Sequence, residues 1–371
     1  MSTAFDPVTV GRHRLRNRIA MAPMTRSRAQ GPGAVATGLM ARYYAQRASA
    51  GLVVTEGIQP SPAGQGYPAT PGLHSDEQVR AWRQVTDAVH DEGGVVFAQL
   101  MHTGRIGHPT LFAEPRTPVS ASPVRAQGQV FTPAGMQDLV TPDELTHEEV
   151  LATVEDFARA ARNAVEAGFD GVEVHGANGY LLHQFLSTNV NRRDDAWGGS
   201  PAGRARLTLE VVRAVADAVG PDRTALRISP GNPFNDIVED DVDVLYPFLV
   251  QELSGKGLAY LHVLETTAPA LTPRLRALWD GPLVLNPATP GSVTGPEQLR
   301  LIETGQTDLV SFGAMFLANP DLPARLAAGG PFNEADMSNA YGGDARGYTD
   351  YPTLAAAPDA AGTPRDRRDA A

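Results

Sequence analysis

The sequence predicts a closed (β/α)8 barrel, and two observations lead to that fold. Eight short apolar runs rich in β-branched residues recur along the chain, and each is followed by a stretch with helical spacing. An open doubly wound sheet usually begins with a glycine-rich dinucleotide loop, and no such loop follows the first two runs. Eight repeats without that loop favour closure into a barrel, whose active site would lie at the carboxyl ends of the strands.

The eight predicted strands are, in chain order, Ile19–Pro23, Leu52–Glu56, Val95–Leu100, Gly171–His175, Ala225–Ser229, Tyr260–Leu264, Leu283–Asn286 and Asp308–Gly313. Two of the intervening helices carry capping boxes at their starts, at Ser75 with Gln78 and at Thr146 with Glu149. In the second helix Val150, Val154, Phe157, Ala161 and Val165 form one apolar stripe, as expected for a helix laid on a barrel.

The stretch between the third and fourth strands indicates an insertion. Residues 103–145 are too many for an ordinary loop and contain several prolines, so we interpret them as an insertion after the third strand that caps the barrel mouth. Residues 355–371 are rich in Ala, Pro, Asp and Arg without apolar periodicity. We therefore expect one barrel domain over residues 1–354 and a mobile tail over residues 355–371.

Composition narrows the class of function. With 31 basic and 42 acidic side chains the net charge is −11, which disfavours binding to nucleic acid or to an anionic membrane surface. The 371 residues include no cysteine, so disulfides, thiolate nucleophiles and cysteine-ligated metals are excluded, and any redox chemistry needs a bound cofactor. No apolar leader and no long apolar run is present. We expect a cytoplasmic enzyme acting on a small molecule, with no signal for an oligomeric state.

The run from His175 to Tyr180 carries the most specific local signal. His175 ends the fourth predicted strand, and Asn178 and Tyr180 follow in a glycine-containing turn, so three polar side chains face the catalytic end. Paired N–H donors from His175 and Asn178 can hold a carbonyl oxygen and stabilise an enolate. A tyrosine stays protonated at neutral pH and can donate a proton to carbon. The structural alternative is that these side chains satisfy buried backbone groups and pack.

The sequence resembles the old yellow enzyme family of flavin-dependent ene-reductases over nearly the whole chain. Several blocks in one order carry the resemblance, namely residues 18–26 (RIAMAPMTR), 55–57 (TEG), 99–105 (QLMHTGR), 171–186, 197–200 (WGGS), 227–230 (RISP), 319–322 (NPDL) and 347–352 (GYTDYP). The resemblance implies a flavin mononucleotide (FMN) across the barrel mouth, reduced by NADPH or NADH.

The resemblance also implies residue roles. The implied cofactor-binding residues are Pro23, Met24 and Thr25 against the ring, Gly57, Gln99 and Arg227 at its polar edge, and Gly313 at the end of the eighth strand. His175 and Asn178 would bind the substrate carbonyl, Tyr180 would protonate the neighbouring carbon, and Tyr351 and Met101 would line the substrate pocket. Met101 stands where many relatives carry a large aromatic residue, although Met also fills gaps in cores. Arg227 has an alternative partner in Glu173.

The sequence departs from the family at the flavin phosphate. Family members use glycine-rich backbone after the seventh strand and an arginine after the Phe-Gly pair that ends the eighth. Here the segment from Asn286 to Pro290 contains two prolines, which lack N–H groups, and Ala314 stands in place of the arginine. The candidates to compensate are Ser311, Thr289, Ser292 and Arg325, and we expect Arg325 to be exposed on the last helix.

Three functional hypotheses follow. The first is an FMN-dependent oxidoreductase that reduces alkenes conjugated to a carbonyl with NADPH or NADH. The second keeps the carbonyl site and Tyr180 but uses no flavin, or a deazaflavin, and includes non-redox isomerisation, addition or cyclisation. The third is a binding protein without catalysis, which has no need of a placed acid. We expect no metal, because the histidines show no metal-type spacing with carboxylates.

Overall fold

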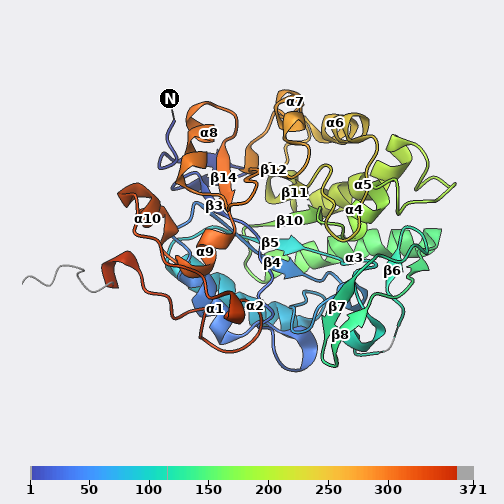
Figure 1. The fold of residues 1–371 in the computed structure, drawn as a ribbon, viewed down its shortest axis with the longest axis horizontal. Helices are drawn as coiled ribbons and strands as arrows, with labels where there is room; N and C mark the ends of the chain where they lie inside the picture. Colours follow the sequence, from blue (N-terminus) through green and yellow to red (C-terminus); the bar gives the residue numbers. More distant parts are fainter. Residues whose placement is uncertain (1, 115, 357–371) are drawn as a thin grey trace, which may run out of the picture.

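The structure, a computed structural model, describes residues 2–114 and 116–356 and contains a closed barrel of eight parallel strands (Figure 1). The strands are β3 (Ile19–Met21), β4 (Leu52–Ile58), β5 (Val96–Leu100), β10 (Gly171–Gly176), β11 (Thr224–Ile228), β12 (Tyr260–Leu264), β13 (Leu283–Asn286) and β14 (Leu309–Phe312). They follow one another around the barrel in chain order, and β14 pairs with β3 to close it. The predicted fold class is confirmed, and every predicted strand is present.

Helices surround the strands (Figure 1). They are α1 (Gly38–Ala45), α2 (Asp76–Asp91), α3 (His147–Glu166), α4 (Leu181–Leu186), α5 (Pro201–Val219), α6 (Val242–Leu253), α7 (Thr272–Leu278), α8 (Arg300–Glu303), α9 (Ala314–Ala318) and α10 (Leu322–Ala328). The two predicted capping boxes are present at the starts of α2 and α3. Within the described part of the chain, no helix is long and apolar enough to cross a membrane.

An N-terminal hairpin covers the amino end of the barrel. Strands β1 (Val8–Val10) and β2 (His13–Leu15) pair antiparallel. Val10 and Leu15 pack with Leu52, Phe97 and Tyr260 in one buried hydrophobic cluster. Because this end is filled by apolar side chains, the carboxyl end of the strands is the end available to a ligand.

The segment between β5 and α3 packs beside the carboxyl end of the barrel. It contains the short strands β6 (Val119–Ser120), β7 (Gln129–Thr132), β8 (Gly135–Asp138) and β9 (Asp143–Glu144), of which β7 and β8 form a hairpin. Ile106, Leu111, Val130 and Leu139 from this segment form a buried cluster with Met101 and Tyr180. The insertion therefore supplies an apolar wall next to the predicted proton donor.

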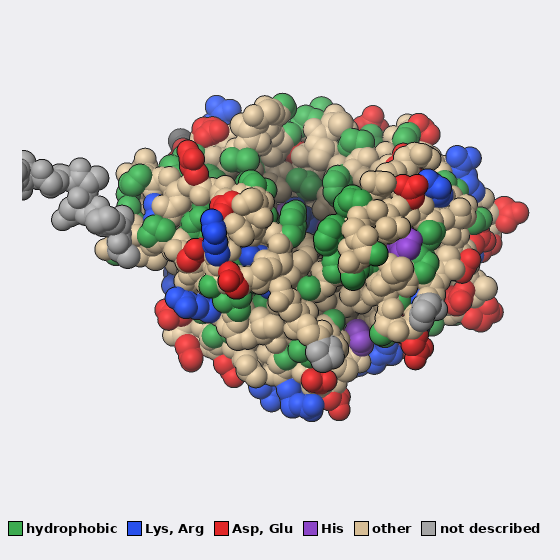
Figure 2. Space-filling view, turned by 60° about the horizontal axis from the view of Figure 1, so that its bottom comes forward, with side chains coloured by type: hydrophobic (Ala, Val, Ile, Leu, Met, Phe, Trp, Pro, Cys, Tyr) green, Lys and Arg blue, Asp and Glu red, His purple; other side chains and the backbone are tan. Residues whose placement is uncertain are grey.

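Figure 2 shows one face of the molecule with a hollow near its middle. Hydrophobic side chains stand along much of the rim of this hollow, while most charged side chains lie toward the outer edge of the face. Of the predicted C-terminal tail, residues 357–371 lie outside the described residues.

Candidate active site

Neighbouring strands place a row of polar side chains inside the barrel. His175 on β10, Arg227 on β11 and His262 on β12 are register partners across adjacent parallel strands, so they lie side by side. All three are buried, with 3%, 4% and 0% of their surfaces exposed. Side chains two residues apart on a strand share a face, so Glu173 lies one layer below His175.

Glu173 is the centre of a buried network beneath this row. Its Oε1 accepts a hydrogen bond from Gln99 Nε2 at 2.8 Å, and its Oε2 lies 3.0 Å from the Tyr260 hydroxyl and 2.8 Å from His262 Nδ1. Burial raises the pKa of the Glu173 carboxyl, but the neighbouring His262 and the Arg227 charge outweigh burial and lower it to about 2. An ionised carboxylate therefore lies under the cationic Arg227.

Arg227 does not form the direct pair with Glu173 that the sequence left open. Its Nη2 donates to Asn286 Oδ1 at 3.3 Å, and its Nε is buried without a partner among the described residues. An unpaired buried N–H is costly, so this atom indicates a place for a ligand acceptor. From the sequence, Glu173 was considered only as a partner of Arg227. In the structure it forms hydrogen bonds with Gln99, Tyr260 and His262.

The polar atoms at this end fit the edge of a flavin ring. Because Gln99 uses its Nε2 to bond Glu173, its Oε1 is left as an acceptor. Arg227 offers the unpaired Nε donor. A flavin pyrimidine edge carries carbonyl oxygens on either side of an N–H group, so it needs both kinds of partner. The residues that would hold this edge are Gln99 and Arg227, as the resemblance implies.

Three further predicted cofactor residues follow the end of β3. Pro23, Met24 and Thr25 are each half-buried in the segment that leaves this strand. Gly313, at the start of α9, lies close to this segment, since a Cβ at residue 313 would be 3.8 Å from Met24 Sδ. The first and last barrel strands thus bring these predicted residues to the same side of the mouth.

Gly57 and Met101 contact each other at the ends of β4 and β5. A Cβ on residue 57 would lie 2.5 Å from Met101 Cε and 2.6 Å from its Sδ, so a larger residue here would require the Met101 side chain to move. Met101 also belongs to the buried cluster that includes Tyr180. Met101 therefore lies beside Gly57 and forms part of the apolar cluster that includes Tyr180, the predicted proton donor.

The turn after β10 carries Asn178 and Tyr180 close to His175, which lies near the end of that strand. Asn178 has φ +57°, an uncommon value for a residue other than glycine. Two contacts hold it there: its backbone N–H donates to Ser229 Oγ at 2.9 Å, and its carbonyl accepts from Asn235 Nδ2 at 2.8 Å. Gly179 is required next, because a Cβ there would lie 2.5 Å from the Phe234 carbonyl oxygen.

His175 is neutral in this environment. Burial, followed by the charge of Arg227, lowers the pKa of its imidazole to about 3. Its Nδ1 is buried without a partner among the described residues. A neutral imidazole carries a single N–H, so His175 can act as a hydrogen-bond donor to a carbonyl without carrying a charge.

Tyr180 stands beside His175 and has a second tyrosine as its neighbour. The ring centroids of His175 and Tyr180 lie 5.4 Å apart, and the Tyr180 hydroxyl lies 3.1 Å from the Tyr67 hydroxyl. Burial raises the pKa of Tyr180 well above its usual value, so the hydroxyl keeps its proton. Tyr67 was missed in the sequence, although its place in the loop after β4, at the catalytic end of a strand, was a usable signal.

Tyr351 lies in the C-terminal segment and is held there by a contact within that segment. Its hydroxyl accepts a hydrogen bond from the Asp336 backbone N–H at 2.8 Å, and its side chain is half-buried. The contacts of the described residues tie Tyr351 to this segment and not to His175. Its role in lining the substrate pocket stays a prediction.

The groups expected to meet the flavin phosphate after β13 and β14 either lack an N–H or are bonded to other residues. Pro287 and Pro290 have no N–H to donate, and the Ala288 N–H donates to Glu265 Oε2 at 3.0 Å. Three of the four candidates to compensate also have other partners. Ser311 is buried, with its Oγ 2.9 Å from His262 Nε2, and Thr289 and Ser292 bond each other in a turn. The ring end of FMN fits this chain better than the phosphate end.

The expectation of an exposed Arg325 is wrong. Arg325 is 1% exposed, and its Nε donates to Asp321 at 2.7 Å. Its Nη1 and Nη2 donate to the carbonyls of Pro331 and Pro352, so it fastens the C-terminal segment to α10. A guanidinium with these partners is committed to structure and not to a phosphate.

His183 and His90 each have an acidic partner within the described part of the chain. His183 on α4 is fully buried, and its Nε2 lies 3.2 Å from Glu239 Oε2. His90, near the end of α2, lies 3.0 Å from Asp170. Over residues 2–114 and 116–356, no group of three or more His, Asp or Glu side chains is placed to hold a metal ion.

Comparison with known proteins shows similarity to flavin-dependent reductases over almost the whole chain. Residues 3–333 match the model of the NADH:flavin oxidoreductase / NADH oxidase family. The rice (Oryza sativa subsp. japonica) protein 12-oxophytodienoate reductase 7 is 39% identical, with 94% of each chain covered. Chanoclavine-I aldehyde reductase from Penicillium roqueforti (strain FM164) is 41% identical, covering 95% of this chain and 96% of the relative.

Solved structures agree with the sequence matches. The old yellow enzyme homologue from Zymomonas mobilis superposes with a TM-score of 0.91 at 38% identity, covering 95% of this chain and all of the homologue. Morphinone reductase in complex with tetrahydroNAD superposes with a TM-score of 0.90 at 40% identity, covering 95% of this chain and 98% of that one. These findings favour the flavin-dependent hypothesis over the flavin-independent and non-catalytic ones.

Proposed function

We propose residue roles and a substrate class for this chain, which belongs to the NADH:flavin oxidoreductase / NADH oxidase family. It is an FMN-dependent ene-reductase of the old yellow enzyme type, with NADPH or NADH as hydride donor. The observation that carries the proposed roles is the grouping of His175, Asn178 and Tyr180 at the carboxyl end of β10, above the paired Gln99 and Glu173.

The proposed reaction adds a hydride and a proton across a carbon–carbon double bond conjugated to a carbonyl. FMN, when bound, supplies the hydride that NADPH or NADH has given it. His175 and Asn178 donate N–H groups to the substrate carbonyl oxygen and stabilise the negative charge that gathers there. Tyr180 donates its hydroxyl proton to the carbon next to the carbonyl, which completes the saturated product.

Tyr67 gives Tyr180 a route to recover its proton. The two hydroxyls lie 3.1 Å apart, and Tyr67 is only half-buried. After Tyr180 has given its proton to the substrate, the Tyr67 hydroxyl can donate a proton to it along this hydrogen bond and take another from solvent.

We further propose that the substrates are small apolar enones and enals. Met101, Ile106, Leu111 and Val130 give the wall beside Tyr180 an apolar surface that a hydrocarbon skeleton can contact. The relatives are named for the reduction of an oxophytodienoate, of chanoclavine-I aldehyde and of morphinone. These names are compatible with a carbonyl-bearing substrate.

The test compares a cyclic enone with the isomer whose double bond is not conjugated to the ketone. Each is incubated anaerobically with purified protein, FMN and NADPH or NADH, and the saturated ketone is quantified. We expect product from the enone and none from the isomer, because only the conjugated carbonyl can accept the charge. Equal rates for the two isomers, or no product from either, would refute the proposal.

A further inference from the structure

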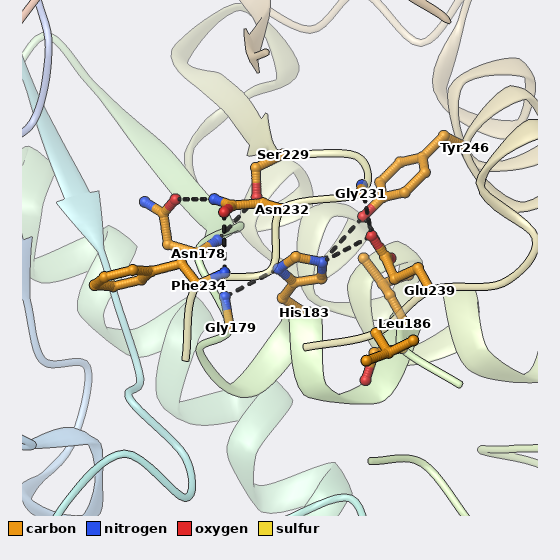
Figure 3. Close-up of polar contacts among 12 residues, drawn as sticks. Asn178, Gly179, His183, Leu186, Ser229, Gly231, Asn232, Phe234, Glu239 and Tyr246 are labelled. Carbon is orange, nitrogen blue, oxygen red and sulfur yellow. Dashed lines mark hydrogen bonds and ion pairs between the residues drawn. The ribbon is translucent and has the colours of Figure 1, made fainter. Parts of the chain in front are cut away.

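The loop after β11 carries an asparagine whose orientation can be assigned without ambiguity. Asn232 is 6% exposed, and its Oδ1 accepts a hydrogen bond from the Phe234 backbone N–H at 3.1 Å (Figure 3). A backbone N–H can only donate, so the atom facing it must be the amide oxygen. The Nδ2 of Asn232 is consequently the atom that faces Asn178.

This orientation is passed on to Asn178. Asn232 Nδ2 donates to Asn178 Oδ1 at 2.9 Å, and Figure 3 shows the two amides meeting end to end. Since the oxygen of Asn178 is taken by this bond, its Nδ2 is the end left for a ligand. A single chain of hydrogen bonds thus runs from the Phe234 backbone through Asn232 to the donor that the substrate carbonyl would meet.

A second set of contacts holds the two loops at a fixed spacing. The Gly179 N–H donates to His183 Nδ1 at 2.9 Å, and His183 Nε2 lies 3.2 Å from Glu239 Oε2. The same carboxylate accepts from the Gly231 N–H at 2.8 Å and from the Tyr246 hydroxyl at 2.7 Å (Figure 3). The residues next to Asn178 and Asn232 are therefore fastened to one buried acid, so the amide pair cannot drift apart.

We propose that Asn232 is a positioning residue that fixes the Asn178 amide as a hydrogen-bond donor toward the substrate. This inference rests on the proposed function, in which Asn178 binds the substrate carbonyl. It goes further by saying why the site accepts carbonyl oxygens: the amide is prevented from rotating to present its own oxygen. Asn178 with its oxygen outward would repel the same carbonyl.

The sharpest test is Asn232→Asp, which keeps the size of the side chain but removes its donor. One carboxylate oxygen can still accept from the Phe234 N–H, while the other now requires a donor from Asn178 and draws its Nδ2 inward. Asn178 then presents Oδ1 to the substrate. We expect kcat/KM for the enone, and the affinity for its saturated ketone, to fall about tenfold or more.

The control is a double-mutant cycle with Asn178→Ala. If Asn232 acts through Asn178, Asn232→Asp should have little further effect in the Asn178→Ala background, whereas general damage to the site would add. Asn232→Ala, which frees the amide without adding a charge, should give a smaller loss with the same dependence on Asn178. Flavin content and melting temperature of each variant show whether it is folded and loaded.

The outcomes separate the two claims. If the unmodified protein does not reduce the enone, the proposed function is contradicted, and this inference with it. Normal reduction by the unmodified protein, with Asn232→Asp within about twofold of it or with equal losses in both backgrounds, contradicts only the role of Asn232.

Discussion

Replacing Tyr180 with Phe removes the proposed acid and leaves the ring in place. A positioned general acid contributes about 10²- to 10⁴-fold to a rate, which corresponds to about 3 to 5 kcal/mol of transition-state stabilisation. Tyr180 is buried, and its hydroxyl has the Tyr67 hydroxyl as a partner at 3.1 Å. We expect the lower end of that range, because Tyr67 is close enough to supply a proton over a longer path.

The assay follows the two half-reactions separately by flavin absorbance. Reduction by NADPH or NADH needs no proton donor to substrate carbon, so Tyr180→Phe should leave its rate within about threefold. Reoxidation by an enone should slow about a hundredfold. Tyr67→Phe is the matched control, since it breaks the same hydrogen bond but keeps the acid, and its reoxidation should slow much less.

Two results would refute this reasoning. If Tyr180→Phe reoxidises as fast as the unmodified protein, the proton comes from another group. If Tyr67→Phe and Tyr180→Phe slow reoxidation equally, the rate depends on the hydrogen bond between the two tyrosines and not on the proton that Tyr180 carries.

The remaining predictions concern packing, cofactor selectivity and pH. Gly57→Ala should overpack against Met101 and cost about 1 to 3 kcal/mol in the free energy of unfolding, and Met101→Ala in the same chain should restore part of it, as chemical denaturation would show. Ala314→Arg should raise the affinity for FMN about ten- to a hundredfold without changing that for riboflavin, measured by equilibrium dialysis; equal gains for both flavins would exclude a phosphate contact. Burial and the charge of Arg227 lower the pKa of His175 to about 3, so the imidazole should stay neutral and the KM for an enone should be constant from about pH 5 to about pH 9. A rise of KM below the ordinary histidine pKa of about 6.5, if it disappeared in His175→Asn, would contradict this.

The barrel could be predicted because its signal is local. Each strand is a short apolar run buried on both faces, and each following helix shows its own period, so neither depends on distant parts of the chain. The capping boxes at Ser75 and Thr146 could be recognised for the same reason, since each box spans only four residues. The segment between the third and fourth strands was visible as excess length, but the cluster that Ile106 and Val130 form with Tyr180 depends on how this segment folds back.

The site could be predicted only as far as strand ends and motif blocks reveal it. His175, Asn178 and Tyr180 lie within six consecutive residues, so their grouping follows from one turn. The bond between Glu173 on β10 and His262 on β12 joins residues 89 apart in the sequence and depends on the order of the strands in the barrel, which no local pattern records.

Arg325 shows why exposure was predicted wrongly. An arginine is usually exposed because its charge is costly to bury. Here Asp321, the N-cap residue of α10, lies four residues before it and pairs with it, and two carbonyls from the C-terminal segment complete its donors. The nearby Asp321 was visible in the sequence, whereas the carbonyls of Pro331 and Pro352 were not.

The central claim is that this chain uses FMN at the ring-binding end formed by Gln99 and Arg227, despite the altered phosphate end. The most direct test is the absorption spectrum of purified protein after exposure to FMN, followed by anaerobic addition of NADPH or NADH and then an enone. We expect a bound flavin spectrum that is bleached by the reduced nicotinamide and restored by the enone. A protein that binds no flavin, or whose bleached flavin is not restored by any enone, would contradict the account.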